Sequence, residues 1–189
     1  MISYKLLSNS IDYYERQGFT RIETPWTVSK YTDNITKPSD VISFQLKHDN
    51  SCLVASGEQS FLFLYLQEQL PKGQFQTTTP CYRAYQIDFL HSRSFIKNEL
   101  IKTDIVNEIE LEKIIKICFN FYKKYLPGVK IIKTKIGYDI EYEGMELGSY
   151  GIRHSDFISW IYATGCAEPR LSKIINLSKN KYGIPQKTN

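Results

Sequence analysis

Residues 79–104, TPCYRAYQIDFLHSRSFIKNELIKTD, limit the possible fold more than any other stretch of the chain. The pattern predicts an extended run over 81–87, a polar turn and a second strand over 94–101. Side chains along a strand point alternately to its two faces, so the apolar Ile96 and Leu100 mark the core face. The other face then presents a cation, an aromatic ring, a second cation and a carboxylate in a line: Arg93, Phe95, Lys97 and Glu99.

The predicted outer face of this hairpin suits a ligand with an anion, a flat base and an amine. Arg83, on the partner strand with Tyr85, offers a forked donor for phosphate. The ring of Phe95 offers a stacking surface for a purine, and Glu99 can hold an ammonium group. A half-exposed hairpin with ordinary surface charges also explains the alternation, so both interpretations stay open at this point.

The composition indicates a single folded domain over residues 1–189. With 42% hydrophobic residues the chain can bury a proper core, and it contains no repeat or low-complexity tract. The net charge of +4 is compatible with a nucleotide or an acidic partner and does not demand nucleic acid. The four cysteines have no CxxC spacing, which favours free, partly buried thiols over disulfides or zinc.

The sequence shows no sign of a membrane or export signal. No apolar run approaches the roughly 20 residues needed to span a bilayer. The first residues lack the charged and apolar regions of a signal peptide. We therefore expect a cytoplasmic protein with no membrane partner.

The periodicity along the rest of the chain changes repeatedly between helix and strand. Helices are predicted over 4–17, 57–70, 106–125 and 167–178. Strands are predicted at 21–25, at 51–56 and within 129–153, with turns at Gly137 and Gly144, and 29–50 is a polar stretch with turn signals. This order predicts an α+β fold in which helices pack against an antiparallel sheet. The helix over 106–125 is expected to bury Ile109, Ile114, Ile115, Phe119 and Tyr122.

Several segments together resemble the catalytic domain of class II aminoacyl-tRNA synthetases, most closely the seryl type, over roughly residues 11–186. They occur in the family's order: GFTRIETPWTV (motif 1), LVASGEQSFLFLY, TPCYR with RSFIKNEL (motif 2), MELGSYGIRHSDF, ATGCAEPRL (motif 3) and YGIPQ. The chain is also similar to stand-alone relatives of this family, the amino acid:carrier protein ligases. The resemblance implies an antiparallel β-sheet flanked by helices, and a homodimer formed through residues 4–28.

The resemblance implies that the chain binds ATP and Mg²⁺. Arg83 would bind the α-phosphate of ATP and the carboxylate of the amino acid. Phe95 would stack on adenine, and Arg170 would cover the other face of the base and reach the γ-phosphate. The catalytic residues would therefore be Arg83 and Arg170. The other nucleotide-side positions are Tyr85, His91, Arg93 and Glu146, and Glu146 would also be the magnesium-binding carboxylate.

For the amino acid, the resemblance implies that Glu58 and Glu99 hold the α-amino group. Ser56 and Ser149 would line a small side-chain pocket, for which Ser, Gly or Ala are the natural substrates. An archaeal branch of the family binds zinc through two cysteines and a glutamate, which Cys166 and Glu99 resemble in part. The pairing of Ser56 with Glu58 favours the pocket without zinc.

The sequence departs from the family pattern at three places. Motif 2 normally reads Arg-x-Glu, whereas this chain has Arg83-Ala84-Tyr85, which puts base selection in question. Motif 3 has Ala167 in place of its second glycine, and Pro169 precedes Arg170, where proline suits a first helical turn. The sequence also contains no counterpart of the helical hairpin with which the seryl type grips tRNA.

These features lead to three hypotheses about function. The first is a ligase that forms an aminoacyl-adenylate and transfers the amino acid to an acceptor other than ordinary tRNA, such as a carrier-protein thiol or a small molecule. Such chemistry depends on positioning and electrostatics and requires no covalent protein nucleophile. The second is a catalytically inactive binding or regulatory module. The third, a protein that edits or modifies tRNA, fits the mild net charge less well.

Overall fold

The computed structural model describes residues 1–38, 41–84 and 87–182. Tyr85 and most of the segment YGIPQ lie outside these ranges. The helices and strands in chain order are α1 (Tyr4–Arg16), β1 (Thr20–Arg21), β2 (Thr27–Ser29), α2 (Lys30–Thr36), β3 (Ser51–Leu53), α3 (Gly57–Leu66), β4 (Gln74–Tyr82), β5 (Ser94–Lys102), α4 (Glu108–Lys123), β6 (Lys130–Lys133), β7 (Tyr138–Tyr142), β8 (Met145–His154), β9 (Ser159–Glu168) and α5 (Arg170–Tyr182).

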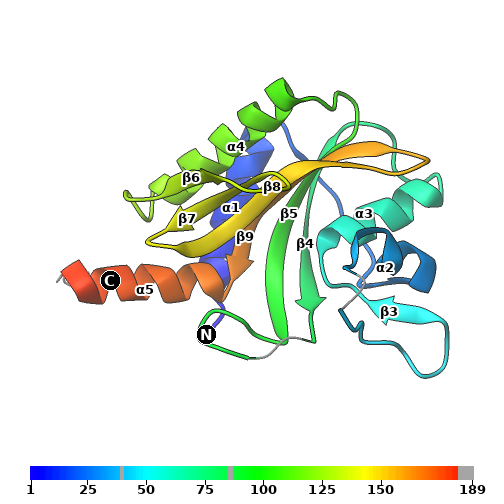
Figure 1. Cartoon of the computed structure of the whole chain (residues 1–189), viewed down its shortest axis with the longest axis horizontal. Helices are drawn as coiled ribbons and strands as arrows, with labels where there is room; N and C mark the ends of the chain where they lie inside the picture. The colour runs from blue at the N-terminus through cyan, green and yellow to red at the C-terminus, as the bar shows by residue number, and fades with distance from the viewer. Residues whose placement is uncertain (39–40, 85–86, 183–189) are drawn as a thin grey trace.

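A seven-stranded sheet in the order β1-β4-β5-β9-β8-β7-β6 organises the molecule (Figure 1). All its neighbouring strands are antiparallel except β1 and β4. Thus the structure confirms the predicted α+β class, with one short parallel pair that was not expected. The strand predicted over 21–25 covers only Thr20–Arg21. Proline cannot donate a hydrogen bond to a neighbouring strand, which fits the exit of the chain from the sheet before Pro25.

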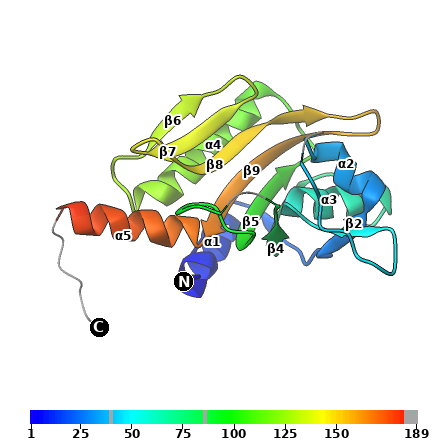
Figure 2. The same cartoon turned by 60° about the horizontal axis from the view of Figure 1, so that its bottom comes forward.

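Helices cover both faces of the sheet (Figure 2). The larger hydrophobic core lies between the sheet and α1, α4 and α5, and includes Tyr14, Phe121 and Leu171. A smaller core lies beside α3 and includes Phe61 and Trp160. The N-terminus of α3 also borders a cavity that is lined by residues of β5, β8 and β9.

The predicted hairpin forms from β4 and β5, whose register pairs Thr77 with Glu99 and Cys81 with Phe95. Leu100 is buried in the larger core, as the alternation predicted. The extended run expected over 81–87 is displaced, because β4 begins at Gln74 and ends at Tyr82. A run of three threonines lies in this earlier part of the strand, and β-branched residues favour a pleated surface.

Helix α1 follows the prediction for residues 4–17. Its N-terminus is capped by Ser3, whose hydroxyl accepts a hydrogen bond from the backbone N–H of Leu6 at 3.3 Å. It ends before Gly18, which adopts a positive φ of 87°. A buried polar contact joins it to the sheet, because Asn98 Nδ2 donates to Ser10 Oγ at 3.1 Å and to Gln76 Oε1 at 3.0 Å.

Two local expectations were wrong. The polar stretch over 29–50 contains the helix α2, which Ser29 caps by accepting from the N–H of Thr32 at 3.1 Å. Ile109, expected in the core, is 66% exposed, because it lies in the first turn of α4 on the solvent side. Within the described residues no helix is both long and apolar enough to cross a membrane.

Candidate active site

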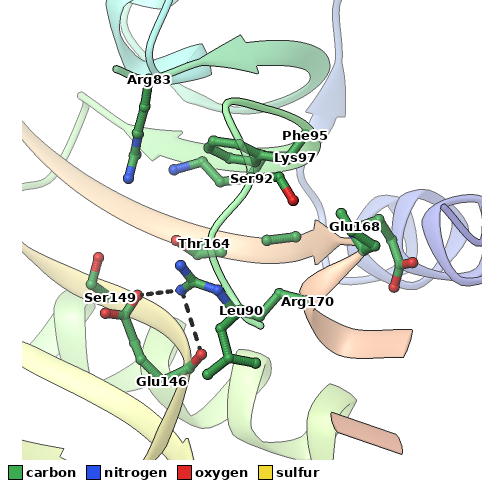
Figure 3. A pocket seen from close by; sticks show the side chains of 12 residues that line it. Arg83, Leu90, Ser92, Phe95, Lys97, Glu146, Ser149, Thr164, Glu168 and Arg170 are labelled. Carbon is green, nitrogen blue, oxygen red and sulfur yellow. Dashed lines mark hydrogen bonds and ion pairs between the residues drawn. The ribbon is translucent and has the colours of Figure 1, made fainter. Parts of the chain in front are cut away.

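A cleft on the α3 side of the sheet contains two adjoining cavities. The first cavity, of about 50 Å³, lies between β5, β8 and the start of α5 (Figure 3). The second cavity, of about 240 Å³, lies between the N-terminus of α3 and the strands β5, β8 and β9. Both cavities are lined by Arg83, Lys97 and Ser149, so these three residues mark the junction between them.

Two guanidinium groups and a phenyl ring converge on the first cavity. Arg83 follows β4 and Arg170 begins α5, and Figure 3 shows both side chains directed into the cavity. The Nε of Arg83 donates to the carbonyl of Ala55 at 2.8 Å, and its Cζ lies 5.2 Å from the centroid of the Phe95 ring. The structure therefore brings these three predicted residues to one cavity, and their binding of a nucleotide stays a prediction.

Two acidic residues fix the position of Arg170. Glu146 contacts its guanidinium directly, and Glu168 anchors the first turn of α5, which Arg170 begins. Its Nη1 lies 2.9 Å from Oε1 of Glu146, across the cavity on β8. The buried Glu168 accepts from the backbone N–H of Ser3 at 2.9 Å and of Ser172 at 3.0 Å, and also from the hydroxyl of Ser172. Glu168 therefore ties the first turn of α5 to the N-terminus of α1. The sequence analysis missed this role, although an acidic residue just before a helix is a known start signal.

Gly57 allows the N-terminus of α3 to approach the sheet closely. A Cβ at this position would lie 2.9 Å from Thr77 Cγ2 and 3.1 Å from the Cβ of Glu99. The approach brings Ser56 to Glu99, and the hydroxyl of Ser56 donates to Glu99 Oε2 at 2.6 Å. Lys97 forms an ion pair with the same oxygen. This part of the second cavity is therefore a buried carboxylate held by one hydroxyl and one ammonium group.

Glu58 has a different environment, although it lines the same cavity. Its Oε1 accepts from Trp160 Nε1 at 2.6 Å, and its Oε2 accepts from Arg153 Nη1 at 2.7 Å. Burial raises the pKa of Glu58 above its ordinary value, although Arg153 and Trp160 act to lower it. The guanidinium of Arg153 also lies over the ring of Tyr162, 4.4 Å from its centroid. The sequence analysis did not identify Trp160, Arg153 or Tyr162 as site residues, because no local pattern connects them with Glu58.

The remaining predicted residues lie on the loop between β4 and β5. His91 Nδ1 is 2.7 Å from Oδ2 of Asp88, and this contact lowers the pKa of Asp88 to about 2. Neither His91 nor Arg93 is among the residues that line the two cavities, and Arg93 is exposed. The structure does not describe Tyr85. Of the residues expected near the phosphates, Arg83, Glu146 and Arg170 therefore line the first cavity, whereas His91 and Arg93 do not.

Glu146 is the residue best placed to share a magnesium ion with a nucleotide. Mg²⁺ is usually held by one or two carboxylates together with substrate phosphates. Glu146 on the cavity wall fits that demand, and no larger His, Cys, Asp and Glu group suited to a metal occurs in the described part of the chain. Burial and the charges of Glu146 and Glu141 raise the pKa of Asp139 to about 6.

The structure does not support a zinc site built from Cys166 and Glu99. In the register of β5 and β9, Cys166 pairs with Asn98 and not with Glu99. Cys166 is fully buried in the larger core, where burial raises the pKa of its thiol. Glu99 lines the second cavity on the other face of the sheet. The two side chains therefore cannot share an ion.

This architecture, a largely antiparallel sheet flanked by helices with a cleft on one face, is that of class II aminoacyl-tRNA synthetase catalytic domains. No family model matches the chain, and no curated protein matches its sequence. Three-dimensional similarity therefore establishes the fold, which confirms the class II fold expected from the motifs. The assignment to the seryl type stays a prediction.

Similar solved structures include the pyrrolysyl-tRNA synthetase from Desulfitobacterium hafniense, with a TM-score of 0.70 and 17% identity over 91% of this chain and 68% of that chain. The seryl-tRNA synthetase from Pyrococcus horikoshii, complexed with ATP, has a TM-score of 0.70 and 16% identity over 90% and 48%. The cytoplasmic serine-tRNA ligase from Naegleria fowleri, in complex with AMP, has a TM-score of 0.66 and 16% identity over 89% and 52%. The chain thus spans between 48% and 68% of the length of these three proteins.

Proposed function

We propose that this protein is a ligase that uses ATP to activate an amino acid as its aminoacyl-adenylate. The observation that supports this most is the convergence of Arg83, Phe95 and Arg170 on one cavity that opens into a second cavity with a buried carboxylate. Adenylate formation needs neighbouring sites of this kind, one for a nucleotide and one for an amino acid. The class II fold is consistent with amino-acid activation in general.

The first cavity is the proposed nucleotide site. Phe95 stacks on adenine, and Arg170 covers the other face of the base. Arg170 exchanges its contact with Glu146 for the γ-phosphate when the nucleotide binds. Arg83 lies at the junction and binds the α-phosphate. Glu146 would hold Mg²⁺, which would supply charge stabilisation for the leaving pyrophosphate.

The second cavity is the proposed amino-acid site. Glu99 receives the α-ammonium group, and Arg83 and Lys97 place the α-carboxylate beside the α-phosphorus. The carboxylate attacks in line, and negative charge gathers on the phosphate oxygens between two fixed cations. Because Ser56 and Ser149 line this cavity, Ser, Gly and Ala stay in the set of substrates to be tested.

We propose that the acceptor is a carrier-protein thiol or a small-molecule amine or hydroxyl, and not ordinary tRNA. The loop between β4 and β5, which in the resembling family meets the tRNA acceptor end, is short here and lies against α5. Lys173 Nζ donates to the carbonyl of Phe89 at 2.7 Å. The mild net charge of +4 also favours an acceptor with few phosphates.

The decisive experiment is amino-acid-dependent exchange of labelled pyrophosphate into ATP, measured with all the standard amino acids. We expect exchange with the wild-type chain, and a loss of at least about a hundredfold in Arg83→Met and Arg170→Met, because each removes a cation from the charge that develops at phosphate. Lys116→Met, on the exposed side of α4, is the matched control and should retain exchange. Absence of exchange with every amino acid, in a well-folded and ATP-binding protein, would contradict the proposal.

A second candidate is an inactive module that binds an amino acid or a nucleotide. It is favoured by the ion pairs within the cleft, where Glu146, Glu99 and Glu58 are each paired with a cation. It is also favoured by Tyr85 in place of the motif 2 glutamate. This candidate predicts heat of binding for ATP or an amino acid in calorimetry, together with no pyrophosphate exchange.

A further inference from the structure

Besides Lys37, Arg153 is the cation of the second cavity to which the proposed activation chemistry assigns no task. Its side chain is 34% exposed and lines the cavity wall. Only one hydrogen bond from its guanidinium is recorded within the described residues, from Nη1 to Glu58. A guanidinium has five N–H donors and no acceptor, so further donors are available to a ligand in the cavity.

Glu58 holds this arginine in place. Both of its oxygens accept short hydrogen bonds, at 2.6 Å from Trp160 and at 2.7 Å from Arg153. In Glu99, by contrast, both the Ser56 hydroxyl and Lys97 contact Oε2. Oε1 of Glu99 is therefore the better acceptor for the α-ammonium, and Glu58 is the carboxylate that orients Arg153 on the wall of the same cavity.

The pair of Glu58 and Arg153 has one buried and one accessible member. Glu58 is buried, whereas the side chain of Arg153 is 34% exposed on the cavity wall. The buried carboxylate therefore holds the guanidinium from behind and leaves it accessible to a ligand in the cavity.

Ser149 at the junction, Tyr162 and Arg153 all line the second cavity. Ser149, Gly151 and Arg153 alternate along β8 and share one face of the strand. A Cβ at Gly151 would lie 2.7 Å from the hydroxyl oxygen of Tyr162, so glycine is required for the tyrosine to lie flat across the floor. A substrate whose reacting end is at the junction can therefore extend over Tyr162 toward the guanidinium.

We propose that the side-chain subsite of this cavity selects an amino acid with a carboxylate side chain, which Arg153 binds through a charge-assisted hydrogen bond. This proposal rests on the proposed function of the cleft, and it replaces the expectation of a small neutral side chain. Glu58 acts as a positioning residue, because it fixes the orientation of Arg153 and does not touch the substrate.

The test is calorimetric binding of L-aspartate, L-glutamate, their amides, L-serine and L-alanine to the full chain, with a non-hydrolysable ATP analogue present. We expect at least one acidic amino acid to bind roughly ten- to a hundredfold more tightly than its amide and than serine or alanine. Arg153→Met should abolish this preference. Lys37→Met, which removes another cation of the cavity rim that is paired with Asp33 at 3.5 Å, should keep it.

Two further variants separate a specific contact from misfolding. Arg153→Lys keeps the charge but loses the planar fork, and should retain only part of the preference. Glu58→Gln keeps an acceptor for Trp160 and should weaken acid binding without changing the affinity for alanine. A preference for serine, glycine or alanine in the wild type, or an acid preference that Arg153→Met and Lys37→Met reduce equally, would overturn the proposal.

Pyrophosphate exchange, measured beside these binding experiments, distinguishes failure of this proposal from failure of the proposed function. Pyrophosphate exchange with neutral amino acids alone would overturn the acidic specificity and leave amino-acid activation standing. Arg153-dependent binding of an acidic amino acid without any exchange would leave the specificity standing and contradict activation.

Discussion

Gly57 shows how one missing side chain shapes the amino-acid side of the cleft. The N-terminus of α3 approaches β4 and β5 so closely that a Cβ at this position would meet Thr77 and Glu99. Neither clash would be relieved by moving a long flexible side chain, because the contacts would be with Cγ2 of Thr77 and with Cβ of Glu99. The position of Ser56 over Glu99 therefore depends on the absence of a single methyl group.

We expect Gly57→Ala to lower the free energy of unfolding by about 1–3 kcal/mol, as overpacking of a buried contact does. It should also raise the KM for the amino acid more than the KM for ATP, because α3 lines the second cavity and not the first. Thermal denaturation and exchange kinetics would measure both effects. Gly128→Ala, whose Cβ would come no closer than 3.3 Å to the ring of Tyr142 and whose φ is outside the left-handed region, is the control with less overpacking. Equal KM changes for both substrates would contradict this account.

The ionisation of Asp139 makes the free energy of unfolding depend on pH, and the raised pKa of this carboxyl sets the direction of that dependence. Its pKa is raised from 3.8 to about 6 in the folded state by burial and by Glu146 and Glu141. A raised pKa means that the folded state binds the proton more tightly, so stability is greatest at low pH and is lost as the pH rises through about 6. Asp139→Asn removes this loss.

We expect Asp139→Asn to raise the melting temperature at about pH 8 by about 2–4 °C, with little change at about pH 4, near the unfolded pKa. This corresponds to about 1 kcal/mol after allowance for solvent screening of a partly exposed carboxylate. Scanning calorimetry of both proteins at the two pH values is the measurement. A gain of the same size at both pH values would show that ionisation of Asp139 is not the cause.

At the scale of elements, the placement of α5 depends on a contact that joins the two ends of the described chain. Glu168 accepts from Ser3 N–H and from Ser172 N–H, so it anchors both α1 and the first turn of α5. Arg170 begins that turn and reaches into the first cavity. The position of Arg170 beside the first cavity is therefore fixed by the packing of α5 through Glu168.

We expect Glu168→Ala to lower the free energy of unfolding by about 2–4 kcal/mol, because two partly buried N–H groups and the Ser172 hydroxyl lose their acceptor. The KM for ATP should rise as Arg170 loses its fixed position, whereas the affinity for the amino acid should change little. Glu168→Gln keeps an acceptor oxygen and should show a smaller change in both. An unchanged melting temperature in the alanine variant would contradict this role.

The elements also show where local sequence patterns predict well and where they do not. Helix α1 and the turns at Gly137 and Gly144 follow from periodicity and from glycine, whose φ is positive at both turns. Helix α2 was missed because its seven residues are mostly polar, and only Ser29 as a cap announces it. Ile109 was misplaced because a wide apolar pattern does not show which residue of a first turn faces solvent.

At the scale of the whole molecule, the sheet separates a larger core under α1, α4 and α5 from a smaller core beside α3. Strand β9 belongs to both, since Ala163 lies in the first and Tyr162 in the second. Because one strand joins the two cores, we expect residues 1–189 to unfold as a single domain in one transition. Two separate transitions in calorimetry would contradict that expectation.

A homodimer through residues 4–28 stays a prediction about the whole molecule. Leu7 and Tyr14 of this segment are already buried within the monomer, so a partner would have to use its outer side chains, such as Trp26, which is 59% exposed. We expect dimers in sedimentation velocity and a shift toward monomer in Trp26→Glu. Tyr31→Glu, at an equally exposed aromatic outside the segment, is the control. A monomeric wild-type chain would contradict the prediction.

The sequence by itself determined the class of fold, the order of the motifs, and the set of side chains that alternate along β5 toward the cleft. These follow from contacts between residues close in the chain, which periodicity and turn residues record directly. Only the tertiary structure decided which carboxylates are paired and with what. Trp160 is 102 positions from Glu58, Arg153 is 95 positions from it, and Ser3 is 165 positions from Glu168. The physical reason is the strand order, because β9 lies between β5 and β8 and brings together side chains that no local pattern connects.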